Sequence, residues 1–316
     1  MATLSGTKPD FTYRPTTISR SARIWASSGA TSANLTISAS ADFFQMQNTP
    51  NRAEIKSQPT VEYTTLQSMT NTINNQYNIL AAGSQNQYLY FTHVSAGDFQ
   101  SIENERHRLR THERFTYFPD IETLIIKIPT REHEVAYRSL GKRITSQVEA
   151  MGLGEDEFLD LGSTKFVAQN SSTKESDGAW LNLQSRPNRG DWPSFVIEAG
   201  YSEGLERLHS DARCWIENSA GQVRIVLLLS IRPSARSIVI EKWELGSGPS
   251  TSNMSPVQTA NLTVTSTEPQ NITGSVPLVL EFNKIFGRAP VALTEHDLTF
   301  TAQDLTNWAD IFWRAM

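Results

Sequence analysis

The sequence predicts an α/β protein, in which apolar strands alternate with helices that are buried along one face. Residues 131–151 and 202–218 predict helices, because their apolar residues recur at steps of three and four. Val223–Ile231 is nearly all apolar, which is typical of a strand covered on both faces. The second helix joins the strand that ends at Gly200 to the strand Val223–Ile231. We therefore expect these two strands to be parallel neighbours that are linked by a right-handed crossover.

The first third of the chain differs from the rest in amino-acid composition and in hydrophobic periodicity. Residues 1–60 are rich in Ser, Thr, Ala and Asn with little periodicity, which predicts a Ser/Thr-rich N-terminal region that is partly disordered. Residues 61–117 predict a polar extension, helical or irregular. Within it, Asp98–Arg114 has too narrow an apolar stripe for a core element and predicts a solvated helix or arm.

Residues 118–245 predict the folded core. Glu122–Pro129 predicts a strand that ends at the proline, and Thr130 is a suitable N-cap for the helix that follows. The buried stripe of that helix consists of Tyr137, Leu140, Ile144, Val148 and Met151. Short strands are then expected at 165–169 and 179–183.

The second half of this core runs from a strand at Trp192–Gly200 to a strand at Ser237–Leu245, with the second helix and the apolar strand between them. Residues 246–316 predict a C-terminal extension that packs on the core. It contains two weak strands and a final helix, in which apolar residues again have helical spacing. These residues are Leu305, Trp308 and Phe312.

Composition and charge narrow the classes of function. A formal net charge of −5 and a pI near 5.7 provide no general basic field for nucleic acid. The single cysteine, Cys214, allows neither an intramolecular disulfide nor a cysteine metal cluster. The first residues lack the layout of a signal peptide, and the longest apolar run is too short for a membrane span. We therefore expect an intracellular protein, cytoplasmic or nuclear, without membrane association.

Two carboxylates, Asp177 and Glu198, are the candidates for chemistry. Asp177 lies on a turn that enters one strand, and Glu198 closes the next, otherwise apolar, strand. Burying such a carboxylate is costly unless a partner compensates its charge. Carboxylates on adjacent strands can hold Mg²⁺, which phosphodiester hydrolysis requires. Glu134 extends the stripe of the first helix and is expected as a third carboxylate at the same end of the sheet.

Several segments, in their order and spacing, resemble a group of uncharacterised fungal proteins. That group is similar in layout to the PD-(D/E)XK nuclease superfamily, and the resemblance covers roughly residues 120–245. It implies a restriction-endonuclease-like core of helix, three strands, helix and strand. The segments are Leu124-Ile-Ile-Lys-Ile-Pro-Thr, Gly162-Ser-Thr, Ser172-Thr-Lys-Glu-Ser-Asp, Trp192-Pro-Ser-Phe-Val-Ile-Glu-Ala-Gly-Tyr-Ser-Glu, Asp211-Ala-Arg-Cys-Trp and Ile240-Glu-Lys-Trp-Glu.

The resemblance also implies roles for particular residues. Asp177 stands at the aspartate of the motif, with Ser176 in place of proline, and Glu198 stands at the (D/E) position. These two residues would hold Mg²⁺, with Glu134 assisting. Gly200 replaces the motif lysine, and Lys242 or Lys174 are the candidates to supply that amine from a neighbouring element. Lys242 would orient or polarise the attacking water.

Two hypotheses of function therefore stay open. The first is a Mg²⁺-dependent phosphodiester hydrolase that acts on nucleic acid. The second is a catalytically inactive nuclease-fold protein that serves as a binding or scaffold module, with protein partners that residues 1–115 could recruit. The alternatives for single residues are an ordinary turn for Asp177, a carboxylate that caps backbone donors for Glu198, a first-turn residue stabilised by the helix N-terminus for Glu134, and a surface lysine for Lys242.

Overall fold

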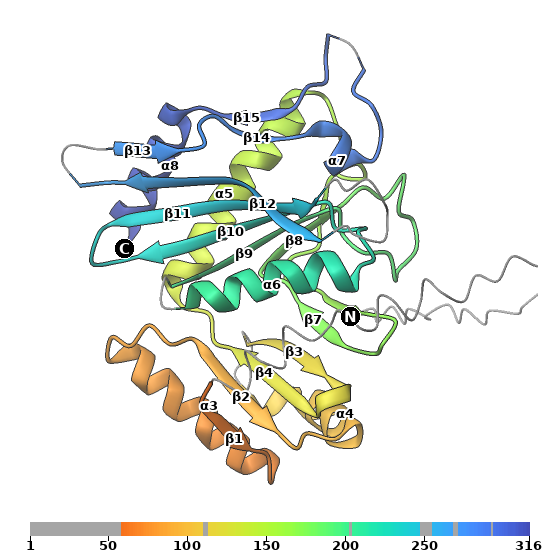
Figure 1. The fold of residues 1–316 in the computed structure, drawn as a ribbon, viewed down its shortest axis with the longest axis vertical. Helices are drawn as coiled ribbons and strands as arrows, with labels where there is room; N and C mark the ends of the chain where they lie inside the picture. Colours follow the sequence, from red (N-terminus) through yellow and green to blue (C-terminus); the bar gives the residue numbers. More distant parts are fainter. Residues whose placement is uncertain (1–57, 110–112, 202–203, 247–254, 268–270, 292) are drawn as a thin grey trace, which may run out of the picture. The chain divides into compact units, whose positions relative to one another are not determined.

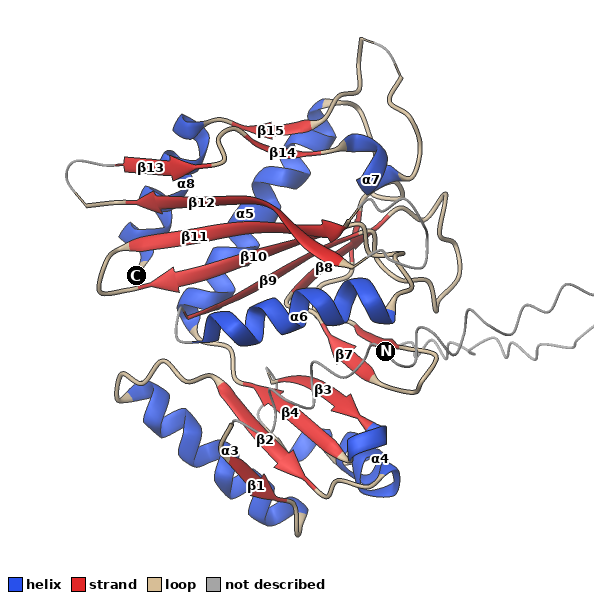
Figure 2. Ribbon diagram, in the orientation of Figure 1, coloured by secondary structure: helices blue, strands red, loops and turns tan. Residues whose placement is uncertain are grey.

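A computed structural model of the chain describes residues 58–109, 113–201, 204–246, 255–267, 271–291 and 293–316. The expectation of a partly disordered N-terminal region falls almost entirely outside the described residues. Within them the chain is α/β, with mixed sheets flanked by helices (Figure 1). Figure 2 shows the two large sheets in red and the helices that cover them in blue.

The first sheet has six strands in the order β1-β2-β4-β3-β7-β6. β1 and β2 are parallel, and the other neighbours are antiparallel. Two helices, α3 (Leu66–Ala81) and α4 (Ala96–Asn104), contribute buried residues to its apolar core. The strands are β1 (Thr60–Glu62), β2 (Tyr88–Thr92), β3 (Arg114–Phe118), β4 (Thr123–Lys127), β6 (Lys165–Val167) and β7 (Thr173–Glu175).

This sheet corrects the expectation for residues 61–117. The described residues of this range contain helices, as expected, but they also form strands and an apolar core of their own, which a polar extension would lack. For Asp98–Arg114 a helix is present as expected, but α4 is not solvated all round, because Phe99 and Ile102 are buried; residues 110–112 lie outside the described residues. The charge of Arg106 is compensated by a tertiary contact that periodicity does not report, whereas Arg108 and Glu105 are exposed and pair locally. The guanidinium of Arg106, in the short 3₁₀ helix η1 (Arg106–Arg108), pairs with Glu175 and covers the ring of Phe115.

The second sheet has seven strands in the order β13-β12-β11-β10-β9-β8-β5. β9 and β10 are parallel, as the crossover helix predicts, and Glu198 lies opposite Leu228. β5, β8 and β9 are antiparallel neighbours. The strands are β5 (Leu159–Asp160), β8 (Gly178–Leu181), β9 (Phe195–Tyr201), β10 (Ile225–Arg232), β11 (Ser237–Leu245), β12 (Pro256–Thr265) and β13 (Asn271–Gly274).

Helices α5 (Arg131–Ala150) and α6 (Leu205–Asn218) cover opposite faces of this sheet (Figure 1). The apolar stripe of α5 packs in one core with Ile197 and Leu227, whereas α6 shares a second core with Val196 and Val226. This division follows from the alternation of side chains along each strand. The Thr130 hydroxyl caps the start of α5 by accepting a hydrogen bond from the backbone of His133.

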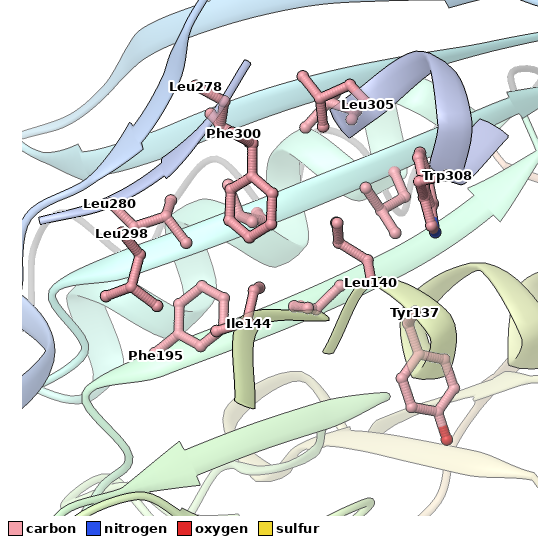
Figure 3. Packing of buried hydrophobic residues seen from close by; sticks show 14 of the residues in the cluster. Tyr137, Leu140, Ile144, Phe195, Leu278, Leu280, Leu298, Phe300, Leu305 and Trp308 are labelled. Atoms are coloured by element: carbon pink, nitrogen blue, oxygen red, sulfur yellow. The ribbon is translucent and has the colours of Figure 1, made fainter. Parts of the chain in front are cut away.

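The C-terminal residues complete the core on the face covered by α5 (Figure 3). The expected final helix is present as α8 (Ala302–Ala315), and its Trp308 donates a hydrogen bond to Ser139 of α5. Leu305 and Trp308 lie on the side of α8 that faces Leu140 in Figure 3. The remaining elements here are β14 (Leu278–Leu280), α7 (Phe282–Phe286) and β15 (Leu298–Phe300), and the 3₁₀ helix η2 (Pro119–Ile121) joins β3 to β4.

The two large sheets meet where the chain passes from one to the other. β7 belongs to the first sheet and β8 to the second, and only Ser176 and Asp177 connect them. β4 of the first sheet leads directly into α5, which covers the second. The junction therefore brings polar residues of both sheets to the position of Asp177.

Candidate functional site

Asp177 and Glu198 meet at this junction. Gly178 of β8 lies opposite Ile197 of β9, so the residue before one and the residue after the other are neighbours. Asp177 Oδ2 accepts the backbone N–H of Ala199 at 2.9 Å. Both carboxylates are buried, with 0 % and 1 % of their side chains exposed. The structure thus brings together the two residues that the sequence singled out.

An ammonium group from the first sheet stands between the two carboxylates. Lys127 Nζ lies 2.6 Å from Asp177 Oδ2 and 3.2 Å from Glu198 Oε2. Lys127 was not among the site residues predicted from the sequence. The available signal was a lysine at the end of the apolar strand Thr123–Lys127, which requires a partner once it is buried.

Glu198 links this group to a second buried set of charges. Its Oε1 accepts the indole N–H of Trp215 at 2.7 Å and lies 3.3 Å from Lys174 Nζ. Lys174 also donates to Asp211 Oδ1 at 2.6 Å, and Arg207 donates to the same oxygen at 2.6 Å. Lys174 is one of the two lysines that the sequence offered, and the structure places it in contact with Glu198.

Residues from the first turn of α5 and from β3 also contact Asp177. His133 Nε2 lies 2.7 Å from Asp177 Oδ2, and Arg114 Nε of β3 lies 3.8 Å from Oδ1. Arg114 also donates to Glu134 Oε1 at 2.9 Å. Glu134 therefore reaches the cluster through a guanidinium and lies at its rim, with 26 % of its side chain exposed.

The expectation for Lys242 is corrected by the structure. Lys242 pairs with Leu227 across β10 and β11, on the face opposite Glu198. Its Nζ donates to both oxygens of Glu281 at 2.9 Å and to the carbonyl of Val279 at 3.1 Å. The alternation of side chains along β11 explains the error, because a shift of one position changes the face of the sheet.

Burial and neighbouring charges shift the pKa values of the two carboxylates in opposite directions. Burial raises the pKa of Glu198 to about 7, although Lys174 opposes the shift. Burial acts in the same direction at Asp177, but there His133 and Lys127 outweigh it and hold the pKa well below its ordinary value. One carboxyl of the pair is therefore firmly ionised, while the other titrates near neutral pH.

Lys127 keeps its charge in this environment. Burial lowers the pKa of a lysine, but Asp177 and Glu198 outweigh burial, so the pKa of Lys127 is raised. The pKa of Lys174 is raised in the same way, against burial, by Asp211 and Glu198. The cluster is a buried network in which cations and carboxylates neutralise each other.

The space inside the cluster is small. A cavity of about 10 Å³ lies beside Lys127 and Glu198, which is about the volume that one water molecule requires. Tyr88 lines it, and its buried hydroxyl has no hydrogen-bond partner among the described residues. A pocket for a small-molecule substrate is typically about 300–1,000 Å³, so the cluster as it stands is closed to one.

No protein-family model matches the chain, and no curated protein matches it. Among the described residues, the helices are too short or too polar for any of them to cross a bilayer. The same residues contain no group of three or more His, Cys, Asp and Glu side chains placed to hold a metal ion.

Proposed function

We propose that this chain is a divergent PD-(D/E)XK-like protein that works as a binding or scaffold module and does not hydrolyse phosphodiesters. The observation that carries the proposal is the Lys127 ammonium between Asp177 and Glu198. It supplies the positive charge that two converging carboxylates require. The protein thereby keeps the layout of a nuclease site without depending on a metal ion for charge balance.

The order of elements supports the nuclease-like part of this proposal. Within the second sheet the chain passes from α5 through three antiparallel strands, β5, β8 and β9, to α6 and to β10, which is parallel to β9. The strands β6 and β7, which belong to the first sheet, come between β5 and β8. The resemblance implies the same order of helix, three strands, helix and strand. Asp177 precedes the second of these strands and Glu198 lies on the third, as the motif requires.

The donors around the carboxylates argue against a Mg²⁺ site in this arrangement. Asp177 Oδ2 already contacts Lys127, His133 and the N–H of Ala199. Both oxygens of Glu198 also face donors. Mg²⁺ requires oxygen ligands at about 2.0–2.1 Å in near-octahedral geometry, and a lysine ammonium at the shared position would repel it. The residues therefore do not fit Mg²⁺ as they lie.

The test compares divalent-cation binding by the wild type and by Lys127→Ala. We expect calorimetry to detect no Mg²⁺ or Mn²⁺ binding by the wild type, and no cleavage of single- or double-stranded nucleic acid. Removal of the ammonium leaves two carboxylates facing each other, so Lys127→Ala should gain affinity for a divalent cation. Lys242→Ala, which removes a buried lysine on the opposite face, is the matched control. It should gain none, because Lys284 still pairs with Glu244 and Glu281, the two carboxylates that Lys242 contacts.

The second candidate is the Mg²⁺-dependent nuclease itself, acting on nucleic acid. One observation favours it, because Glu198 contacts two amines, that of Lys174 at Oε1 and that of Lys127 at Oε2, and Lys127 also contacts Asp177. If the wild type binds one Mg²⁺, loses it in Asp177→Asn and Glu198→Gln, and cleaves a nucleic acid with the same dependence, the non-hydrolytic proposal is wrong. Circular dichroism of each variant separates loss of binding from loss of fold.

A further inference from the structure

A larger cavity lies away from the carboxylate cluster, beside the final helix. Its volume is about 620 Å³, within the range of about 300–1,000 Å³ that is usual for small-molecule sites. It is formed by α5, α8 and the turn between β10 and β11. Its lining residues are Arg143, Arg236, Asn307, Asp310, Ile311 and Arg314.

The walls of this cavity are fixed by packed helices. The lining residues of α8 run from Asn307 to Arg314 at steps of three and four, so they form one face of the helix. The opposite face carries the buried Trp308, which is hydrogen-bonded to Ser139 of α5 at 2.8 Å. Arg143 lies one turn further along α5 than Ser139. The two helices therefore hold Arg143 and Arg314 across the same hollow.

The third arginine is held by a turn. Arg236 has a φ of 42°, in the left-handed region of the backbone that residues other than glycine rarely adopt. Its N–H donates to Pro233, and its carbonyl accepts from Ser266. Its guanidinium lies 5.4 Å from the ring centre of Trp313, which is buried on α8. A backbone in this conformation persists only where its surroundings enforce it, so the position of Arg236 is constrained.

The charge of the cavity is unbalanced. Three of its six lining residues are arginines and one is an aspartate. Among the residues that the structure describes, the three arginines form no ion pair, although Asp310 lines the same cavity and the charge of Arg143 acts on Asp304. Guanidinium groups stay charged at any physiological pH, so three of them against one lining carboxylate leave an excess of positive charge that an anion would balance. This local excess is notable in a chain whose net charge is −5.

We propose that this cavity binds a small molecule that carries a phosphate group. The three guanidinium groups would bind the phosphate oxygens, and the rest of the molecule would lie against Ile311, whose apolar side chain is 48 % exposed. A phosphate monoester has three terminal oxygens and a charge of about −1.5 to −2, whereas a carboxylate has two oxygens and one charge. Three forked donors therefore match the phosphate better. This proposal does not depend on the function proposed above.

The experiment is calorimetric titration of the full chain with inorganic phosphate and with adenosine monophosphate. We expect one saturable site for each, with tighter binding of the nucleotide. Arg143→Gln and Arg314→Gln should each weaken binding by about tenfold or more, because each removes charge-assisted hydrogen bonds. Ile311→Ser should weaken the binding of the nucleotide and leave that of inorganic phosphate unchanged.

The control is Lys142→Gln, which removes one positive charge from the exposed residue next to Arg143 without touching the cavity. Its affinity should stay within about twofold of the wild type. An equal loss in Lys142→Gln would show non-specific attraction and overturn the proposal, as would the absence of saturable binding by the wild type. Binding of citrate as tight as that of the nucleotide, or of an oligonucleotide alone, would overturn the assignment to a small phosphate-bearing molecule.

Discussion

The carboxylate cluster and the arginine cavity use similar charged groups in opposite ways. In the cluster, Lys127 and Lys174 lie within 3.3 Å of carboxylates, and all of these side chains are buried. In the cavity, Arg143 and Arg314 face a hollow of about 620 Å³ and form no ion pair with described residues. The first arrangement is complete without a ligand, whereas the second has three arginines against one aspartate.

This difference teaches which charged residues stabilise the fold and which are available to a ligand. A buried charge depends on its partner, so the loss of one member leaves the other uncompensated in a region of low dielectric constant. A charge on an open cavity is hydrated, so its loss affects stability little. The type of residue alone does not decide between these roles, since both regions contain basic side chains on regular elements.

The largest effect is expected for Asp177→Asn. Lys127 loses a carboxylate that compensates its charge, and His133 loses its contact with Oδ2, so the free energy of unfolding should fall by about 3–5 kcal/mol. Glu149→Gln, at an exposed position of α5, should change it by less than about 0.5 kcal/mol. Urea denaturation monitored by circular dichroism measures both. If both variants lose an equally small amount of unfolding free energy, the cluster is hydrated, and the contrast between the buried cluster and the open cavity is wrong.

A smaller effect with a defined pH dependence is expected for Glu198→Gln. Burial raises the pKa of Glu198 from 4.5 to about 7 in the folded protein. Its stabilising contribution is therefore fully present below pH 4.5 and is lost as the pH rises through 7. Because each pKa unit corresponds to about 1.4 kcal/mol, the stability of the wild type relative to the variant should fall by roughly 3 kcal/mol over this interval.

The comparison with the variant isolates Glu198 from other titrating groups. Burial lowers the pKa of His133, but this residue is present in both proteins, so its contribution cancels in the difference. Denaturation curves recorded at several pH values between 4 and 8 provide the measurement. A difference that does not change with pH would mean that Glu198 titrates at its ordinary pKa.

The smallest effect on stability is expected for Arg314→Gln in the cavity. Without ligand, the free energy of unfolding should change by less than about 0.5 kcal/mol, because the guanidinium is exposed and has no described ion-pair partner. Adenosine monophosphate should raise the melting temperature of the wild type and not that of the variant. A loss as large as that of Asp177→Asn would assign Arg314 to the fold instead of to a ligand.

The sequence could predict those elements whose pattern is local. The helix at 131–151 and the apolar strand at 223–231 correspond to α5 and β10 within a few residues. Their periodicity shows directly which side chains are buried. In the first sheet the sequence predicted strands at the positions of β4 and β6 but not the strands before residue 118. The pattern there is weak, because α4 places only Phe99 and Ile102 in the core, and the charge of Arg106 is compensated by Glu175 from a distant strand.

For the candidate site, the sequence by itself determined that Asp177 and Glu198 lie on neighbouring segments and that each would need a partner if buried. Only the tertiary structure decided which partner. Lys127 belongs to the other sheet, and Lys242, on a strand close to Glu198, faces the opposite side. The alternation of side chains along a strand depends only on neighbouring residues. The contact between two sheets, in contrast, brings together residues that lie far apart in the chain. The identity of a buried counter-charge is therefore a property of the fold and not of any single motif.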